Sequence, residues 1–355
     1  MTITIHITMK LRSLLFIILS FVGCACQRDP VPGDGGQLFV NLVGMEDTKA
    51  IIGANPAEMQ LNSLNLYVFD SNGMLDLSHA CTERELWSRS VVLSVKPGSK
   101  TVYALANFQG APLEAANACT TCAELEQVAF NLGDNQPNGL LMTAFSYTQV
   151  LSGSSNSAML ELTRPVARVA LGSVTNNLPA PYGAVRVLRA FLCNVVGNQN
   201  VAGSADPTVW YNRSATSDYV AGHVIGKDGY AAQVPALTYA ALDQDVAMGA
   251  THTFSQKYFY AFPNALTNPN NGYQATFAPT ATVLMVVVQI KNVPYYYPVA
   301  LTGTLERNKD YKVDLTLIGL GNTEDRPFDR IEKAYLPVQV RITNWVDGAK
   351  YNESL

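Results

Sequence analysis

The sequence is poor in charged residues and has no block of basic residues. Charged residues make up 15% of its 355 residues, against roughly 25% in an average soluble protein. Its 24 basic and 28 acidic residues give a net charge of −4. This balance argues against binding to nucleic acid or to an anionic membrane surface, because both need a positive face that neutralises phosphates. A hydrophobic content of 48% argues against general disorder.

Histidine is scarce, and the sequence lacks the usual signatures of enzymes. His6 precedes the predicted mature chain, which leaves His79, His223 and His252. No two of them lie four residues apart and none is adjacent to a cysteine, so no zinc or metalloprotease pattern is present. A nucleophile elbow, a P-loop and a dinucleotide fingerprint are also missing. We therefore predict no metal site, no cofactor and no enzymatic activity.

The one motif that suggests redox chemistry is Cys119-Thr-Thr-Cys122. It lacks the aromatic or Gly-Pro interior and the long following helix that are typical of thioredoxin-like sites. A structural interpretation is therefore favoured, with a local disulfide or a bond to Cys81 or Cys193. The spacing does not decide the pairing.

The N-terminus has the pattern of an export signal. Lys10 and Arg12 are followed by an apolar run from Leu14 to Val22, which is too short to span a membrane but fits a signal-peptide core. The ending Phe-Val-Gly-Cys24 resembles a bacterial lipobox, in which the cysteine receives lipid. We expect residues 1–23 to be a signal peptide and 24–36 a lipidated tether to the outer membrane. The alternative is an ordinary secretory signal cleaved nearby.

Short apolar and alternating runs recur from residue 38 to residue 342, separated by turn sequences such as Asp70-Ser-Asn-Gly73. Asn-Gly between two apolar runs is a strong hairpin signal. Many short strands with turn punctuation indicate β-sandwiches. We predict an all-β protein of two β-sandwich domains with transthyretin-like or Greek-key topology, 37–174 and 175–355, and one short helix within 119–130. The segment 196–256 has few apolar runs and is expected to form surface loops or an insertion.

Six segments, in order, resemble the Bacteroidales fimbrillins, the type V pilins of the major fimbrial subunit and Mfa-like kind. They are LNSLNLYVFDSNGML (61–75), TVYALANF (101–108), LTRPVARVAL (162–171), YFYAFPN (258–264), RNKDYKVDLTLIGLG (307–321) and LPVQVRITNW (336–345). By this resemblance, the segment 162–171 contains the strand that closes the first domain, with Arg164, Ala167 and Arg168 at its centre. The resemblance implies a structural subunit of cell-surface fimbriae that serves adhesion.

The resemblance also implies how such a subunit assembles. A protease cuts after a basic residue beyond the first strand, and a strand from another subunit fills the exposed groove. Here the cut would fall between Lys49 and Ala50, where the family usually has arginine. The displaced strand would include Leu38, Val40 and Leu42. The candidate donor strand is C-terminal, with Val338, Val340 and Ile342 on one face. The expected partners are copies of this chain or related pilins, and outer-membrane lipid through Cys24.

Two alternatives keep the first strand in place. One is an uncleaved anchor or accessory subunit, which the lysine at position 49 would favour. The other is a monomeric surface lipoprotein that binds host or bacterial glycans or proteins through aromatic residues such as Trp210, Tyr211 or the cluster Tyr295–Tyr297. Buried strand aromatics are the more common outcome for such a cluster.

Overall fold

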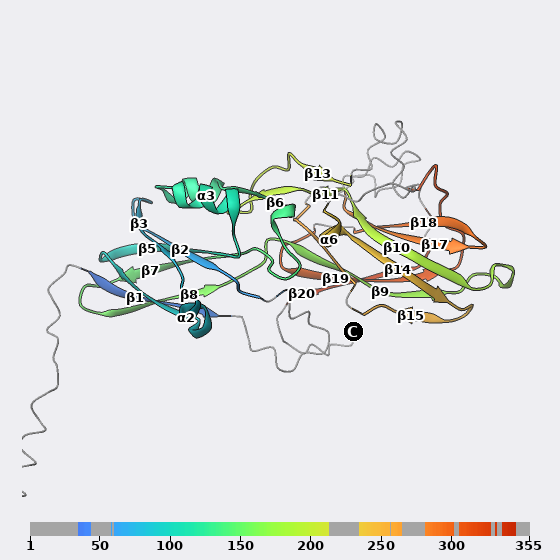
Figure 1. Cartoon of the computed structure of the whole chain (residues 1–355), viewed down its shortest axis with the longest axis horizontal. Helices are drawn as coiled ribbons and strands as arrows, with labels where there is room; N and C mark the ends of the chain where they lie inside the picture. The colour runs from blue at the N-terminus through green and yellow to red at the C-terminus, as the bar shows by residue number, and fades with distance from the viewer. Residues whose placement is uncertain are drawn as a thin grey trace, which may run out of the picture.

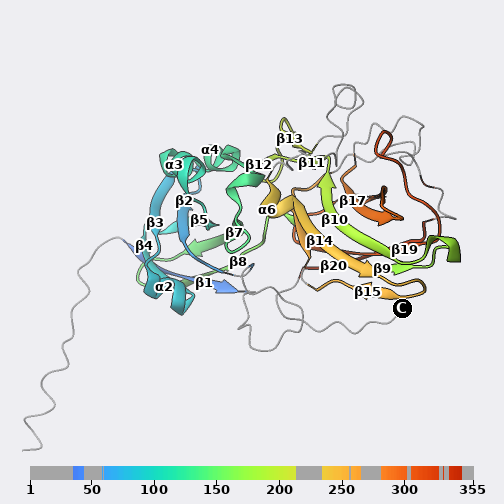
Figure 2. The same cartoon turned by 45° about the vertical axis from the view of Figure 1, so that its right-hand side comes forward.

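Two β-rich halves lie side by side along the long axis of the protein (Figures 1 and 2). The structure is a computed structural model that describes residues 35–43, 58, 60–212, 234–255, 257–264, 281–301, 305–327, 331 and 336–345. Within these ranges, no helix is long and apolar enough to cross a membrane. Strands dominate both halves, which confirms the predicted all-β class.

Two sheets pack face to face in the N-terminal half. The larger has the strand order β3-β2-β5-β7, and the smaller has the order β4-β1-β8. Their strands are β1 (Gly36–Val43), β2 (Leu64–Phe69), β3 (Leu75–Ala80), β4 (Ser90–Val95), β5 (Gly98–Ala106), β7 (Met142–Val150) and β8 (Ser155–Glu161). The hairpin between β2 and β3 turns at Gly73, whose φ of 75° suits a residue without a side chain.

The larger sheet is buried on both faces at its central strand β2. Because successive side chains point to opposite faces of a strand, Leu66 and Val68 join the apolar cluster that includes β1. Tyr67 and Phe69 instead join a second cluster on the other face. Every residue of β2 is consequently buried.

Three α-helices lie among the described residues of the N-terminal half, where one was predicted. They are α2 (Glu83–Ser88), α3 (Gly110–Ala118) and α4 (Cys122–Gln127). The predicted helix within 119–130 corresponds to α4, which Thr121 caps through the backbone N–H of Glu124. The expectation of a single helix was wrong because α2 buries no residue and α3 consists largely of small residues. Neither has the apolar periodicity on which a helix prediction rests.

The C-terminal half is a second pair of sheets. One has the order β14-β10-β17-β18, and the other has the order β15-β9-β19-β20 with β16 also paired to β9. Their strands are β9 (Ala167–Asn176), β10 (Val185–Cys193), β14 (Tyr239–Val246), β15 (Thr251–Thr253), β16 (Tyr258–Ala261), β17 (Val283–Ile290), β18 (Val293–Ala300), β19 (Lys309–Leu317) and β20 (Val338–Asn344).

The two halves share one apolar core. Short strand β6 (Ala129–Asn131) from the first half pairs with β12 (Asn198–Asn200) from the second. Beside this pairing, Phe130 packs edge to face against Phe108 and Phe262, with ring centroids 5.3 and 5.5 Å apart. The remaining short elements are β11 (Val195–Val196), β13 (Trp210–Tyr211), α6 (Pro235–Thr238), η2 (Leu132–Asp134) and η3 (Ala180–Tyr182).

Strand β9 joins the C-terminal sheets although it lies almost entirely before the predicted boundary at 174. It pairs with β15, β16 and β19, all of which follow residue 250. The expectation that this strand closes the first domain therefore does not match its pairing, because apolar alternation identifies a strand but not its neighbours. We propose that the division between the halves falls between β8 and β9.

The segment 196–256 contains more regular structure than the sequence predicted. Strand β14 lies at an edge of its sheet and pairs with β10, while β15 pairs with β9. Most residues of β14 are exposed or half-buried, so this strand shows little of the apolar signal by which a buried strand is recognised.

Candidate functional site

The first strand of the protein is the central strand of a sheet. Strand β1 lies between β4, with which it pairs antiparallel, and β8, with which it pairs parallel. Both neighbours come much later in the chain, so β1 occupies a slot made by the rest of the N-terminal half. Its removal would leave one side of β4 and one side of β8 without their hydrogen-bonded partner.

The side chains predicted for the displaced strand fill the core of the N-terminal half. Leu38 and Val40 are fully buried and Leu42 is 7% exposed. All three belong to one apolar cluster with residues of β2, β4, β5, β7 and β8. Val43 is exposed, and Phe39 and Asn41 are half-buried. Strand β1 is therefore an integral part of this core.

Close contacts fix the register of β1. A Cβ atom added to Gly36 would lie 2.3 Å from Cγ1 of Val150, so β1 begins where only glycine fits. The Asn156 side chain donates a hydrogen bond to the backbone carbonyl of Gln37 at 3.1 Å. The hydroxyl of Ser90 donates to the Asn41 side chain at 2.9 Å.

The candidate donor strand is the edge strand of the C-terminal half. Strand β20 pairs antiparallel with β19 and has no second partner among the described strands. Val338 and Val340 are half-buried against the core, whereas Ile342 is 54% exposed. The predicted alternation is present, and the sheet leaves the apolar side chain of Ile342 largely uncovered.

A buried charged cluster connects Glu58, which lies between β1 and β2 in the chain, to Trp345, which directly follows β20. The Arg168 guanidinium donates to the Glu58 carboxylate at 2.7 Å and forms a two-pronged contact with Asp310 at 3.1 and 2.9 Å. Arg164 donates to the backbone carbonyl of Glu58 at 3.2 Å. The Trp345 ring lies over both guanidinium groups, at 4.5 Å from Arg164 and 4.9 Å from Arg168.

The surroundings of Arg168 favour its charged form. Burial alone would lower the pKa of Arg168, but the hydrogen bonds and negative charges of Asp310 and Glu58 raise that pKa above its ordinary value. The Tyr260 hydroxyl donates a further hydrogen bond to Glu58. A buried charge is tolerated only when it is paired and hydrogen-bonded, and Glu58 meets both conditions.

Sequence reasoning found the arginines of this cluster only through the family resemblance and missed Glu58. A lone acidic residue outside any alternating run gives no sign that it is buried. The one usable signal is the pair of arginines at positions 164 and 168, because buried arginines require acidic partners somewhere in the chain.

Three of the predicted site residues lie outside the described residues. They are Cys24, the expected lipidation site, and Lys49 and Ala50, the expected processing site. Described structure ends at Val43 in β1 and resumes at Glu58. These three assignments remain predictions.

The predicted disulfide is not present among the described cysteines. Cys81, Cys119, Cys122 and Cys193 are all free. The thiol of Cys119 donates to the carbonyl of Ala115 at 3.2 Å, and that of Cys122 contacts Glu126 at 3.8 Å. Burial raises the pKa of both thiols. Since the thiolate is the reactive form, this environment gives the pair little nucleophilic character.

The aromatic residues considered for glycan binding do not form an open platform. Tyr296 and Tyr297 are buried, and Tyr295 is half-buried on the same strand, β18. The Tyr297 hydroxyl donates to the carbonyl of Gly319 at 3.1 Å. Trp210 and Tyr211 are half-buried in β13. These side chains contribute chiefly to packing.

Solved structures with the same fold come from bacterial surface proteins. A proposed cell adhesion protein from Bacteroides eggerthii is 18% identical with a TM-score of 0.61, covering 89% of this chain and 97% of its own. A fimbrilin from Porphyromonas gingivalis is 14% identical with a TM-score of 0.58, covering 87% and 97%. The truncated tip fimbrial protein Mfa3 from the same species is 15% identical with a TM-score of 0.53, covering 88% and 100%. The protein therefore has a fimbrilin fold.

Part of the sequence is also similar to a known family. Residues 40–204 match the family described as major fimbrial subunit protein (FimA). This match confirms the predicted resemblance to the fimbrial subunits over residues 40–204. No curated protein matches the sequence. The family is one of structural subunits of the cell surface and not of enzymes, in agreement with the prediction that the chain has no enzymatic activity.

Proposed function

We propose that this protein is a fimbrial subunit that is exported as a lipoprotein and polymerises by exchange of its first strand. Lipidation would occur at Cys24, and proteolysis between Lys49 and Ala50 would release β1. The C-terminal strand of another subunit, equivalent to β20 here, would then enter the slot between β4 and β8. The resulting filaments would serve adhesion at the cell surface.

The observation that carries the proposal is the position of β1. It is the N-terminal strand of the described structure and the central strand of its sheet, and the next described residue after its end at Val43 is Glu58. A single cut between Val43 and Glu58 would detach it without breaking any other described strand. The predicted processing site at Lys49 falls within this interval.

The energetics also support assembly through this slot. Burial of a leucine or valine side chain contributes about 1.5–3 kcal/mol, so the loss of Leu38, Val40 and Leu42 would remove several kcal/mol. The slot would then expose buried side chains such as Leu93 and Leu160, together with unpaired backbone groups on β4 and β8. Another strand can satisfy these backbone groups and refill the core.

Strand β20 has the properties of a donor for this slot. Its alternate residues Val338, Val340 and Ile342 match the alternation of Leu38, Val40 and Leu42. It is held by one neighbouring strand instead of two, which makes its release less costly than that of a central strand. Edge strands with apolar side chains are prone to pair with another chain.

The proposal is tested by following processing and assembly together. The protein with β1 intact is treated with trypsin, its new N-terminus is sequenced, and its size is measured on unheated gels. We expect a new N-terminus at Ala50 and ladders of high mass. The Lys49→Ala variant should keep the original N-terminus and stay monomeric, while the matched variant Lys96→Ala, at an exposed lysine, should behave as wild type.

Two results would overturn the proposal. A chain that begins at Ala50 but remains monomeric and as heat-resistant as the intact protein would show that β1 is not a removable plug. A resistant monomer in cells that still build filaments from other subunits would instead favour the uncleaved anchor, which keeps both its lipid and β1.

A further inference from the structure

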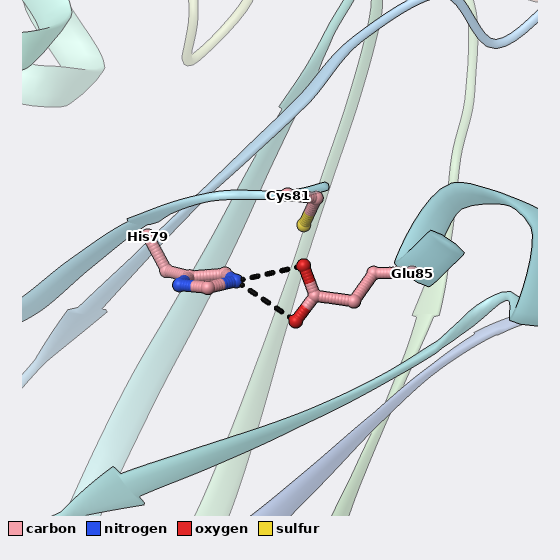
Figure 3. A group of neighbouring side chains, drawn as sticks. All are labelled: His79, Cys81 and Glu85. Carbon is pink, nitrogen blue, oxygen red and sulfur yellow. Dashed lines mark hydrogen bonds and ion pairs between the residues drawn. The ribbon is translucent and has the colours of Figure 1, made fainter. Parts of the chain in front are cut away.

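Three side chains with metal-binding groups meet beside the N-terminal core (Figure 3). His79 lies in β3, Cys81 directly follows that strand, and Glu85 lies in α2. One ligand atom from each lies within 4.8 Å of the other two. Nε2 of His79 is 3.1 Å from both carboxylate oxygens of Glu85. All three residues are half-buried.

The local sequence explains why these groups converge. His79 and Cys81 are two residues apart at the end of a strand, so their side chains point to the same face. Helix α2 begins directly after them, with Thr82 as its N-cap and Glu85 at the third helical position. In this capping box, the Thr82 backbone N–H and hydroxyl donate to Glu85 at 2.7 and 2.8 Å. The carboxylate is therefore held toward His79 by its own helix.

The backbone around the group is equally fixed. The N–H of Cys81 donates to the carbonyl of Leu64 in β2 at 2.8 Å. Cys81 and Leu86 pack against the apolar cluster that β1 fills. A preorganised carboxylate and a fixed backbone reduce the conformational entropy that a ligand would otherwise have to remove.

The chemistry of the three groups matches Zn²⁺. Imidazole nitrogen, thiolate sulfur and carboxylate oxygen are the ligands of this ion, at about 2.0 Å for nitrogen and oxygen and about 2.3 Å for sulfur. In a tetrahedral site the ligand atoms lie roughly 3.3–3.6 Å apart. The nitrogen–oxygen separation of 3.1 Å is already close to this value. A side-chain rotation that moves the Cys81 sulfur by about 1 Å would bring it to a tetrahedral distance from the other two ligand atoms.

One feature is unfavourable to metal binding, namely the raised pKa of the Cys81 thiol, and the charge of the ion counteracts it. Burial and the negative charge of Glu85 raise the pKa of Cys81 to about 12, so the thiol is protonated when no ion is bound. A divalent cation reverses this effect and displaces the proton to solvent. Half-burial leaves the group reachable by an ion and leaves room for water as a fourth ligand.

We propose that His79, Cys81 and Glu85 form a zinc site. The ion would fasten the end of β3 to α2, the helix that leads into β4. Strand β4 forms one side of the slot that β1 occupies. Bound zinc would therefore hold the β3–α2–β4 connection in place independently of β1.

The site is tested with Zn²⁺ and Co²⁺ on the purified protein with β1 in place, after removal of bound metal with a chelator. Calorimetry should show one zinc ion per chain, and cobalt should give the absorption of a cobalt–thiolate bond. Cys81→Ser should abolish that absorption and weaken zinc binding at least about tenfold. Glu85→Gln should also weaken binding, although glutamine can still complete the capping box. Zinc should raise the melting temperature of the wild type more than that of either variant.

Matched variants separate this site from other thiols and carboxylates. Cys122→Ser removes another half-buried cysteine, and Glu83→Gln removes another first-turn acid of α2. Both should bind zinc as the wild type does. Absence of stoichiometric binding, or unchanged binding by Cys81→Ser and Glu85→Gln, would overturn the proposal and leave the His79–Glu85 contact as a simple ion pair.

Discussion

The Glu58 carboxylate accepts a hydrogen bond from the Arg168 guanidinium at 2.7 Å, although 110 residues separate them in the chain. Glu58 lies between β1 and β2, whereas Arg168 lies in the C-terminal sheets. Trp345, at the end of β20, stacks on the same guanidinium. Glu58 and the residue after the last described strand, Trp345, thus lie on the same guanidinium group.

Glu58→Gln should strongly destabilise the protein. The substitution removes the negative charge beside a buried guanidinium, and we expect it to lower the free energy of unfolding by about 2–4 kcal/mol. Urea unfolding measures this difference. The control is Asp243→Asn, which breaks the exposed Arg186–Asp243 pair and should leave the stability nearly unchanged, because water screens exposed ion pairs. If the two variants lowered the free energy of unfolding equally, the buried cluster would contribute no more to stability than an exposed ion pair.

Gly36→Ala should destabilise the packing of β1 between its neighbouring strands and lower the melting temperature. The new methyl group would meet Val150 at 2.3 Å and the carbonyl of Leu151 at 3.0 Å, and such overpacking typically costs about 1–3 kcal/mol. Gly35→Ala is a matched control, since its methyl group would lie 3.7 Å from the nearest atom. Thermal unfolding compares the two. If both variants had the same melting temperature as the wild type, the slot would have room for a methyl group at position 36, contrary to the structure.

Ile342→Lys should separate assembly from folding. Ile342 is 54% exposed, so the change should alter monomer stability by no more than about 0.5 kcal/mol. If β20 is the donor strand, a lysine there would have to enter an apolar slot and ladders should disappear from unheated gels. Thr343→Lys, on the opposite face of the strand, should still form them. Normal ladders from Ile342→Lys would argue against β20 as donor.

Glu124 should contribute to acid sensitivity. Hydrogen bonds from the backbone and hydroxyl of Thr120, and from the backbone of Thr121, lower the pKa of Glu124 below its ordinary value of 4.5. A lowered carboxylate pKa contributes stability above the ordinary value, and this contribution is lost as the pH falls through the lowered one. Glu124→Gln should therefore lose stability less steeply than the wild type below pH 4.5, as measured by circular dichroism.

The control for this measurement is Glu114→Gln, at an exposed position within α3. It should follow the acid profile of the wild type. An unchanged slope for Glu124→Gln would mean that the capping contacts of α4 do not distinguish the charged from the neutral carboxyl group.

The sequence predicted those strands whose side chains have a simple environment. The runs SVVLSV (90–95) and VLMVVVQI (283–290) are two of the short apolar runs that recur between residues 38 and 342, and they form β4 and β17 with these bounds. Asn72-Gly73 was expected to form a hairpin and does so between β2 and β3. In each case a local signal is sufficient, since alternation, an apolar run or a turn residue determines the conformation.

What the sequence could not give is which strands are neighbours. Strand β9 was assigned to the first half and pairs with the second, because its alternating pattern fits either sandwich. The burial of Glu58 depends on Arg168 and Tyr260, which are distant in the chain. Similarly, His79 and Cys81 gained a third neighbour only through the capping geometry of α2.

The placement of β1 has a mechanical consequence. Its hydrogen bonds run across the strand to β4 on one side and β8 on the other. A force along the strand axis would load these bonds together in shear, instead of opening them one at a time as in unzipping. A strand from another subunit in the same slot would be loaded in the same way. Tension along a filament built from such joints would therefore be spread over a whole ladder at every junction, which suits a surface structure that must hold a cell against flow.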